Sequence, residues 1–269
     1  MKAAPLSYHR AEGIAQAIEL CSRYDGTAKL MAGGQSLMPM MNLRMSLAEH
    51  VIDISGIKEL RECREAKDKY FLGAGVTHAM LEDGRVEDPT RGYLRHVAAG
   101  IAYRSVRNRG TIGGSLAHAD PAADWPAALL ALNAIVVIQN AQGDRQLPLA
   151  EFQRGLMETA LGSADVLKGV LVPRLSARAR WSYRKFTRKA GEFAHSIAAV
   201  VLDPSLGISN VVLGAAGGKP LFVSEKNFEG ELVSAGFART SYEFQLHRTL
   251  LARAIAEAKK AKKGSEQFI

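Results

Sequence analysis

Two glycine-rich segments constrain this chain more than any other feature of its sequence. The first is Ala-Gly-Gly-Gln-Ser-Leu at 32–37, and the second is Thr-Ile-Gly-Gly-Ser at 111–115. Glycine lets the backbone approach a ligand closely and adopts positive φ without strain. Consecutive backbone N–H groups can then surround an anion, and the hydroxyls of Ser36, Thr111 and Ser115 add donors. Two such loops in one chain predict a pair that holds a pyrophosphate from both sides.

Neither loop fits the commonest nucleotide-binding motifs. Neither reads G-x-G-x-x-G or ends in G-K-[ST], and Gly73-Ala-Gly75 lacks the third glycine of a dinucleotide fingerprint. A tight turn with a glycine bulge therefore stays open for each loop taken alone. His78, His118 and His195 are isolated in sequence, and we interpret them as local hydrogen-bonding residues rather than metal ligands.

The residues behind the second loop suggest a helix entry. Asp120-Pro121 has the form of an N-cap followed by proline at the first helical position, and Asp124 lies one turn further on. A carboxylate at 124 could accept hydrogen bonds from ribose hydroxyls or complement the helix dipole.

Hydrophobic spacing predicts a mixture of helices and strands. A polar, charged break near residues 55–68 and a second boundary near Pro173 divide the chain into the expected units 1–56, 57–173 and 174–269. The expected helices cover 11–23, 126–134 and 244–263. The expected strands and hairpins cover 29–32, 51–54, 70–75, 135–149, 181–186 and 195–213. With 269 residues, 47% of them hydrophobic, the chain is long enough for more than one packed unit.

The cysteine count limits the metal chemistry of this chain. Its two cysteines, Cys21 and Cys63, are too few for a disulfide framework, a four-cysteine zinc site or an all-cysteine iron–sulfur cluster. Cys21 falls in an apolar helical pattern and is expected in the core. If the protein moves electrons beyond an organic cofactor, the metal centres belong to another chain. No apolar run approaches the length of a membrane span, and we expect a cytoplasmic protein.

The net charge of +8 raises nucleic acid binding as a different class of function. Basic proteins bind nucleic acid, and Trp181, Tyr183 and Phe186 interleave with the basic residues between Arg174 and Lys189. Strand alternation explains the same spacing, so we expect no nucleic acid partner. A solvated face or a docking surface for an acidic protein are the other interpretations of this stretch.

The two loops together resemble the flavin motifs of the FAD-binding medium subunits of molybdenum hydroxylases. This is the family of aerobic carbon monoxide dehydrogenase and xanthine dehydrogenase. Besides 32–37 and 111–115, the resemblance is carried by Ala-Asp-Pro-Ala-Ala-Asp at 119–124, Asn42-Leu-Arg44, Gly73-Ala-Gly-Val-Thr77, Arg107-Asn-Arg109 and Arg188-Lys-Ala-Gly-Glu-Phe193. These segments extend over nearly the whole chain.

The resemblance implies an α+β fold. Two α/β subdomains, of the type shared with p-cresol methylhydroxylase-like flavoproteins, would hold FAD between them. A C-terminal domain with a small antiparallel sheet and helices would cover the flavin. The resemblance further implies an iron–sulfur small subunit with two [2Fe–2S] clusters and a molybdopterin large subunit as partners, in a dimer of heterotrimers.

The resemblance also transfers site residues to this sequence. The residues that it implies as contacts to FAD are Ala32, Gly33, Gly34, Gln35, Ser36, Leu37, Thr111, Ile112, Gly113, Gly114, Ser115, Ala119, Asp124, Leu167 and Lys185. Leu167 matches a hydrophobic contact, Lys185 a basic residue near the ring, and Phe193 an aromatic beside it. Gln35 stands where some relatives have histidine, and Trp125 where leucine is common.

The expected function is electron transfer through FAD. Electrons would arrive from the iron–sulfur clusters and leave to an external acceptor, with no catalytic acid or base on this chain. A free-standing FAD-dependent oxidoreductase with its own substrate site is the alternative.

Overall fold

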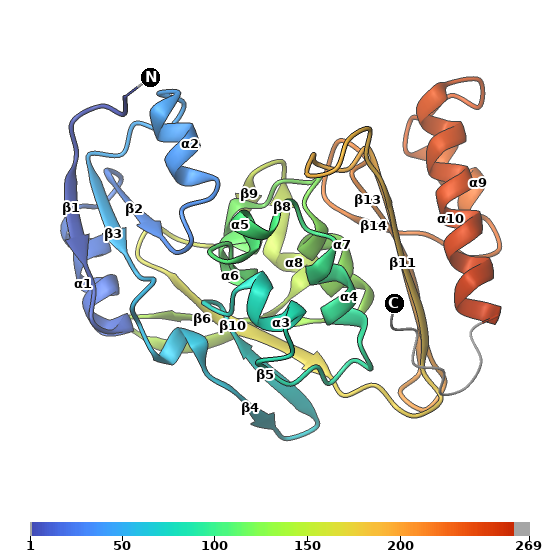
Figure 1. Cartoon of the computed structure of the whole chain (residues 1–269), viewed down its shortest axis with the longest axis horizontal. Coiled ribbons are helices and arrows are strands. Elements are labelled where there is room, and N and C mark those ends of the chain that lie inside the picture. Colours follow the sequence, from blue (N-terminus) through green and yellow to red (C-terminus); the bar gives the residue numbers. More distant parts are fainter. Residues whose placement is uncertain (1, 261–269) are drawn as a thin grey trace.

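The computed structural model describes residues 2–260 and contains three main sheets, each with its own helices (Figure 1). The first sheet is parallel, with strand order β1-β3-β2. Its strands are β1 Ser7–Arg10, β2 Ala28–Met31 and β3 His50–Asp53, and its helices are α1 Ile14–Arg23 and α2 Leu37–Asn42.

Helix α1 joins the first sheet to the rest of the molecule. Its apolar residues recur at helical spacing, and Ile14, Ala17, Ile18 and Cys21 are buried. They belong to the same core cluster as Leu72 of the second sheet, so one continuous core extends across both units. The expectation that Cys21 is a small core residue is confirmed.

The second sheet is antiparallel, with strand order β4-β5-β10-β6-β7. Its strands are β4 Cys63–Ala66, β5 Lys69–Gly73, β6 Ile135–Asn140, β7 Gly143–Pro148 and β10 Val166–Pro173. The helices of this unit are η1 Glu59–Arg61, α3 His78–Glu82, α4 Tyr93–Ala99, α5 Arg104–Arg107, α6 Ile112–His118, α7 Asp124–Ala131 and α8 Leu149–Phe152. A small hairpin pairs β8 Gln153–Gly155 with β9 Glu158–Thr159.

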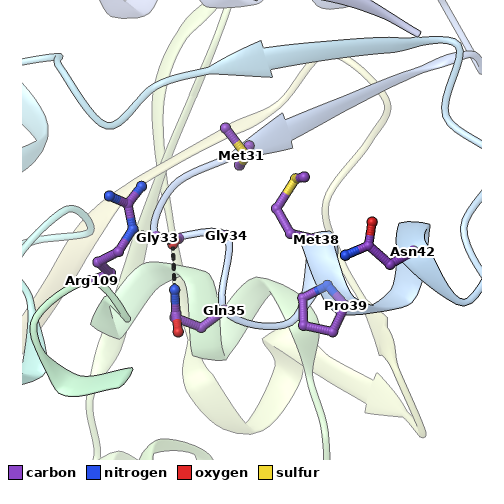
Figure 2. Close-up of a pocket in the computed structure, with 8 residues that line it drawn as sticks. All are labelled: Met31, Gly33, Gly34, Gln35, Met38, Pro39, Asn42 and Arg109. Carbon is purple, nitrogen blue, oxygen red and sulfur yellow. Dashed lines mark hydrogen bonds between the residues drawn. The ribbon is translucent and has the colours of Figure 1, made fainter. Parts of the chain in front are cut away.

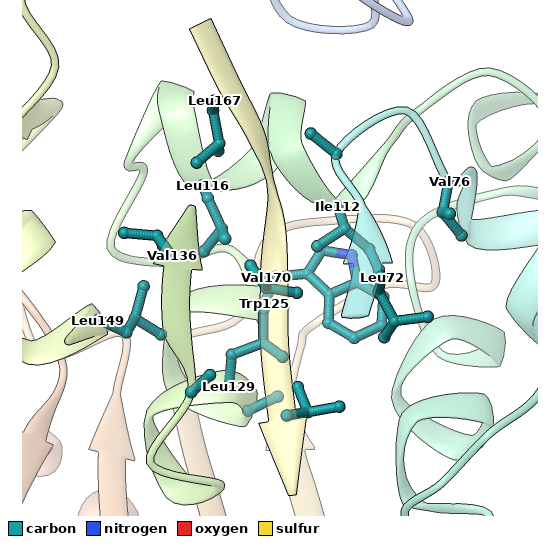
Figure 3. Close-up of a cluster of buried hydrophobic side chains, with 14 of the residues drawn as sticks. Leu72, Val76, Ile112, Leu116, Trp125, Leu129, Val136, Leu149, Leu167 and Val170 are labelled. Carbon is teal, nitrogen blue, oxygen red and sulfur yellow. The ribbon is translucent and has the colours of Figure 1, made fainter. Parts of the chain in front are cut away.

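The core of this unit is centred on Trp125, which is fully buried at the start of α7. Side chains from α6, α7, β5, β6 and β10 surround it (Figure 3). Helix α7 is buried along its entire length, because it lies between the second sheet and the third.

The third sheet is antiparallel, with order β11-β12-β13-β14. Its strands are β11 Arg180–Phe186, β12 Ser196–Asp203, β13 Ile208–Gly214 and β14 Leu221–Phe222, and its helices are α9 Phe228–Ser234 and α10 Tyr242–Lys260. Helices α9 and α10 cover one face of this sheet, and α7 and α4 lie on the other (Figure 1). Strand β12 is therefore buried on both faces, which explains its nearly continuous apolar run.

The predicted α+β architecture is confirmed. Most elements begin or end within a few residues of their expected positions, and the last three residues of the helix expected over 244–263 lie outside the described residues. The prediction that a helix begins at Asp120-Pro121 is wrong. Asp120 Oδ1 accepts a hydrogen bond from the N–H of Ala122 at 2.9 Å, which makes a local turn, and α7 begins only at Asp124 with Ala123 as its N-cap.

The basic stretch from Arg174 to Lys189 is largely paired within the protein. Arg174 forms ion pairs with Glu65 and Glu87, and Arg184 pairs with Glu257. Lys185 pairs with Asp124, and Arg180 donates to the carbonyl of Lys259. These contacts reduce the charge available to a docking partner. Within residues 2–260, no helix has both the length and the apolar character that a membrane crossing requires.

Candidate functional site

The first glycine loop leaves a row of backbone donors unused. Strand β2 ends at Met31, and α2 begins at Leu37. Within residues 2–260, none of the five N–H groups from Gly33 to Leu37 donates to a protein acceptor. Gly34 has a φ of +71°, a left-handed conformation that favours glycine. This segment has the free donors that the sequence predicted for an anion-binding loop.

A pocket opens beside these donors. It has a volume of about 390 Å³ and is lined by Met31, Gly33, Gly34, Gln35, Met38, Pro39, Asn42 and Arg109 (Figure 2). All but Arg109 come from β2, the first loop and α2. Arg109 comes from the residues just before the second loop, so the pocket lies where the two loops meet.

Gly33 is glycine because Arg109 and Gly110, just before the second loop, pack directly against it. A Cβ at this position would lie 2.0 Å from the carbonyl oxygen of Arg109, closer than any real contact. The carbonyl of Gly33 accepts hydrogen bonds from Gln35 Nε2 at 3.2 Å and from Arg109 Nε at 3.3 Å. The structure thus brings the two predicted loops into contact, and the missing side chain at 33 makes room for protein backbone.

The second loop is different, because its residues form the start of a helix. Thr111 is the N-cap of α6, and its Oγ1 accepts from the N–H of Gly114 at 3.0 Å. The N–H groups of Ile112, Gly113 and Ser115 donate to the carbonyls of Val76, Ala74 and Thr111. The expectation that this loop also offers free backbone N–H groups is wrong, since its glycine pair lies inside a helical turn whose donors are already bonded.

The segment after β5 supports the second loop and was absent from the predicted site. Its residues run beside the loop, with an isolated bridge between Thr77 and Thr111 and a bond from His78 N–H to the carbonyl of Gly110 at 3.0 Å. A Cβ at Gly113 would lie 2.3 Å from the Cβ of Ala74. The glycines of Gly73-Ala-Gly-Val-Thr77 mark this segment in the sequence, although a Cβ at Gly73 or Gly75 would meet the backbone of Leu60 and not the second loop.

Asp124 is a buried carboxylate at the first position of α7. Its Oδ1 accepts from the hydroxyl of Tyr183 at 2.7 Å and from Lys185 Nζ at 2.8 Å, both on β11. Burial and the Asp124 carboxylate raise the pKa of Tyr183 well above its ordinary value, so this hydroxyl stays protonated and donates. In the described part of the chain, Oδ2 has no hydrogen-bond donor. Tyr183 was not among the predicted site residues, and no motif marks it.

Several other predicted site residues lie in apolar clusters or at a helix end. Ile112 and Leu167 lie in the core around Trp125 (Figure 3), and Leu37 packs against a small apolar cluster that contains Met41. Ala119 is the left-handed C-cap of α6, with a φ of +53°. Their contacts to a cofactor stay predictions. Phe193, expected beside the flavin ring, is largely exposed.

Comparison with known proteins identifies the family. Residues 4–175 match the family described as "FAD binding domain in molybdopterin dehydrogenase". The chain belongs to this family. The match contains both glycine loops and Asp124, and the recognition made from the sequence is confirmed.

The relatives of this FAD-binding chain come from multi-subunit dehydrogenases. It is 34% identical over 237 residues to the 6-hydroxypseudooxynicotine dehydrogenase complex subunit alpha of Paenarthrobacter nicotinovorans, covering 87% of this chain and 80% of the relative. It is 33% identical to the carbon monoxide dehydrogenase medium chain of Hydrogenophaga pseudoflava, covering 88% and 83%. The solved carbon monoxide dehydrogenase from Hydrogenophaga pseudoflava has a chain with a TM-score of 0.87 and 30% identity, covering 96% of this chain and 99% of that one.

The residues present fit the cofactor of the family. A dinucleotide needs donors for its phosphates, and the first loop offers five consecutive N–H groups beside an open pocket. The dinucleotide also has hydroxyl groups, and Oδ2 of Asp124 can accept a hydrogen bond from one of them. The chain is a flavoprotein subunit of the molybdopterin dehydrogenase type.

Proposed function

We propose that this chain binds FAD without a covalent link and transfers electrons within a molybdenum hydroxylase. The observation that carries the proposal is the row of N–H groups from Gly33 to Leu37, which have no acceptor within residues 2–260 and lie in a loop that lines a pocket together with Arg109. Bound FAD would supply the redox chemistry, while the protein binds and orients it.

Each part of the site has a role in this proposal. The first loop donates backbone hydrogen bonds to the diphosphate. The second loop acts as a rigid support, because α6 and the segment from Ala74 to His78 fix its position. Asp124 holds Lys185 through Oδ1 and leaves Oδ2 to accept from a hydroxyl of the cofactor. Further predicted contacts are the hydroxyls of Ser36 and Ser115.

The electron route would begin on partner chains. The two cysteines of this chain cannot ligate a four-cysteine cluster. Membership of the family implies that a small subunit would hold two [2Fe–2S] clusters and a large subunit the molybdopterin cofactor. The names of the relatives support such an assembly, since one is a subunit of a dehydrogenase complex and another a medium chain. We propose a dimer of heterotrimers that passes electrons to an external acceptor.

The relatives also support a substrate site elsewhere in the complex. Two of them share 34% and 33% identity with this chain, although their names refer to a nicotine derivative and to carbon monoxide. Such different substrates are compatible with one conserved subunit when that subunit handles only electrons.

Two measurements test the proposal. Denaturing the purified protein should release a yellow flavin of dinucleotide size, and a folded chain that neither contains nor takes up flavin contradicts it. Co-expression with genes for candidate partner chains, followed by size exclusion and metal analysis, should give an iron- and molybdenum-containing complex. A flavoprotein free of both metals that oxidises an organic substrate by itself would support the free-standing oxidoreductase instead.

A further inference from the structure

Arg109 lies at the junction of the two glycine loops. Its carbonyl oxygen lies against the backbone at Gly33. Its side chain lies beside the same glycine (Figure 2), where Nε donates to the carbonyl of Gly33 at 3.3 Å. These contacts hold the base of the guanidinium at the pocket wall. Arg109 is not among the residues that the family motifs assign to the cofactor.

The outer edge of this guanidinium is free. Within residues 2–260, Nη1 and Nη2 of Arg109 have neither a hydrogen-bond acceptor nor an ion-pair partner. The other arginines nearby are paired, since Arg104 and Arg107 both bond to Glu82. A guanidinium has five N–H donors in a fixed plane, so four of them remain for a ligand.

The charge of Arg109 is isolated in an otherwise neutral pocket. Among the described residues that line the pocket, Arg109 alone carries a charge. The unused N–H groups from Gly33 to Leu37 lie in the loop that forms the same wall, and they contribute donors without net charge. A cation beside a row of amide donors suits a phosphate group, which guanidinium binds with two parallel hydrogen bonds.

We infer that Arg109 is the charged contact to the diphosphate of the bound dinucleotide. It would give the site its preference for a flavin that carries a diphosphate over a phosphate-free flavin. The neutral side chains Met31, Met38 and Pro39 offer an apolar surface for the adenosine attached to the diphosphate. This inference rests on the proposed FAD function and assigns a binding role to a residue that the resemblance did not assign to the cofactor.

The experiment compares ligands that differ in phosphate content. The full chain, stripped of flavin, is titrated with FAD and with riboflavin by fluorescence, and ADP is tested as a competitor of FAD. In Arg109→Gln we expect FAD to bind roughly 10- to 100-fold more weakly, which corresponds to the loss of one hydrogen-bonded charge. Riboflavin affinity should not change, and ADP should lose its competition. Raising the salt concentration should weaken FAD binding less in the variant than in the wild type.

Two further variants separate charge from structure. Arg109→Lys keeps the charge and should retain part of the FAD affinity and its salt dependence. Arg178→Gln removes a charge that does not line the pocket, in the loop between β10 and β11, and should bind FAD like the wild type. Thermal melting checks that each variant is folded.

Equal FAD binding by wild type and Arg109→Gln would overturn this inference and leave the proposed function intact. So would an equal loss of FAD and riboflavin binding, because it would show that Arg109 only supports the loop. If the wild-type chain binds no FAD, the proposed function fails and the inference fails with it.

Discussion

The indole N–H of Trp125 donates to Nδ1 of His78 at 3.0 Å, in the interior of the middle unit. The bond joins the start of α7 to the segment that supports the second glycine loop. A Cβ at Gly110 would lie 2.7 Å from Nε2 of the same imidazole, so the ring also packs against the loop itself. Trp125 therefore has a structural role in this chain, because it connects α7 to the support of the second loop.

The first prediction concerns the acid stability of this pair. Burial and the nearby Arg107 charge lower the pKa of His78 to about 4 in the folded protein, from an ordinary value of 6.5. Between these two values the unfolded chain binds more protons than the folded one. The stability from neutral His78 is therefore complete above pH 6.5 and is lost as the pH falls through the folded pKa, at a cost on the order of 3 kcal/mol.

Chemical denaturation between pH 4 and pH 8 measures this effect. His78→Gln should be less stable than wild type at pH 8 and should lose less stability on acidification. Trp125→Phe removes the donor to Nδ1 and should cost roughly 1–3 kcal/mol at neutral pH. Parallel acid profiles for wild type and His78→Gln would show that His78 is not the titrating group.

The second prediction concerns Gly33. We expect Gly33→Ala to destabilise the flavin-free protein by roughly 1–3 kcal/mol, because the new methyl group would overlap the carbonyl of Arg109. Gly13→Ala is the matched control, since the nearest atom to its Cβ, Glu59 Oε1, is 3.8 Å away. Thermal melting of the apoprotein measures both. An unchanged Tm for Gly33→Ala would mean that this glycine serves only the cofactor.

The third prediction concerns Gly114, which lies in α6 and does not have a positive φ. We expect Gly114→Val to abolish flavin retention while most of the fold survives. Its Cβ would lie 2.9 Å from Thr111 Oγ1 and 3.9 Å from Ala32 Cβ, so a branched side chain disturbs the cap and enters the space between the loops. Loss of the cap costs about 0.5–2 kcal/mol.

Flavin content set against thermal melting is the measurement for Gly114→Val. Gly218→Ala, in the loop between β13 and β14, serves as a control, because its Cβ would have no neighbour within 4 Å and its φ is not positive. Full flavin occupancy in Gly114→Val would show that the loop is a structural turn and nothing more.

The fourth prediction compares Asp124 with Tyr183, which donates a hydrogen bond to its Oδ1. Asp124→Asn removes the charge that faces Lys185, and we expect a loss of roughly 1–3 kcal/mol together with weaker FAD binding. Tyr183→Phe removes only one donor to Oδ1, so it should cost about 1–2 kcal/mol and leave FAD affinity unchanged. FAD titration and melting of both variants provide the comparison. Equal effects on FAD binding would contradict a direct role for Asp124.

The sequence by itself determined the fold class, the two loops and the family. Glycine pairs beside hydroxyl residues mark places where backbones come close, and hydrophobic spacing marks most helices and strands, because both depend on local geometry. The helix entry at Asp120 failed for the opposite reason, since an Asp–Pro pair fits a local turn as well as a cap.

Only the tertiary structure decided what each glycine approaches and which donors stay free. A Cβ at Gly33 would meet the carbonyl of Arg109 and a Cβ at Gly113 would meet Ala74, so the missing side chains at these two positions make room for atoms of the protein itself. The N–H groups of residues 112–115 in the second loop are bonded within the chain, whereas those of residues 33–37 in the first have no acceptor among the described residues. Asp124 meets Tyr183 and Lys185 across about 60 residues of sequence. No local pattern encodes these partners, because they are brought together only when the three sheets pack around α7.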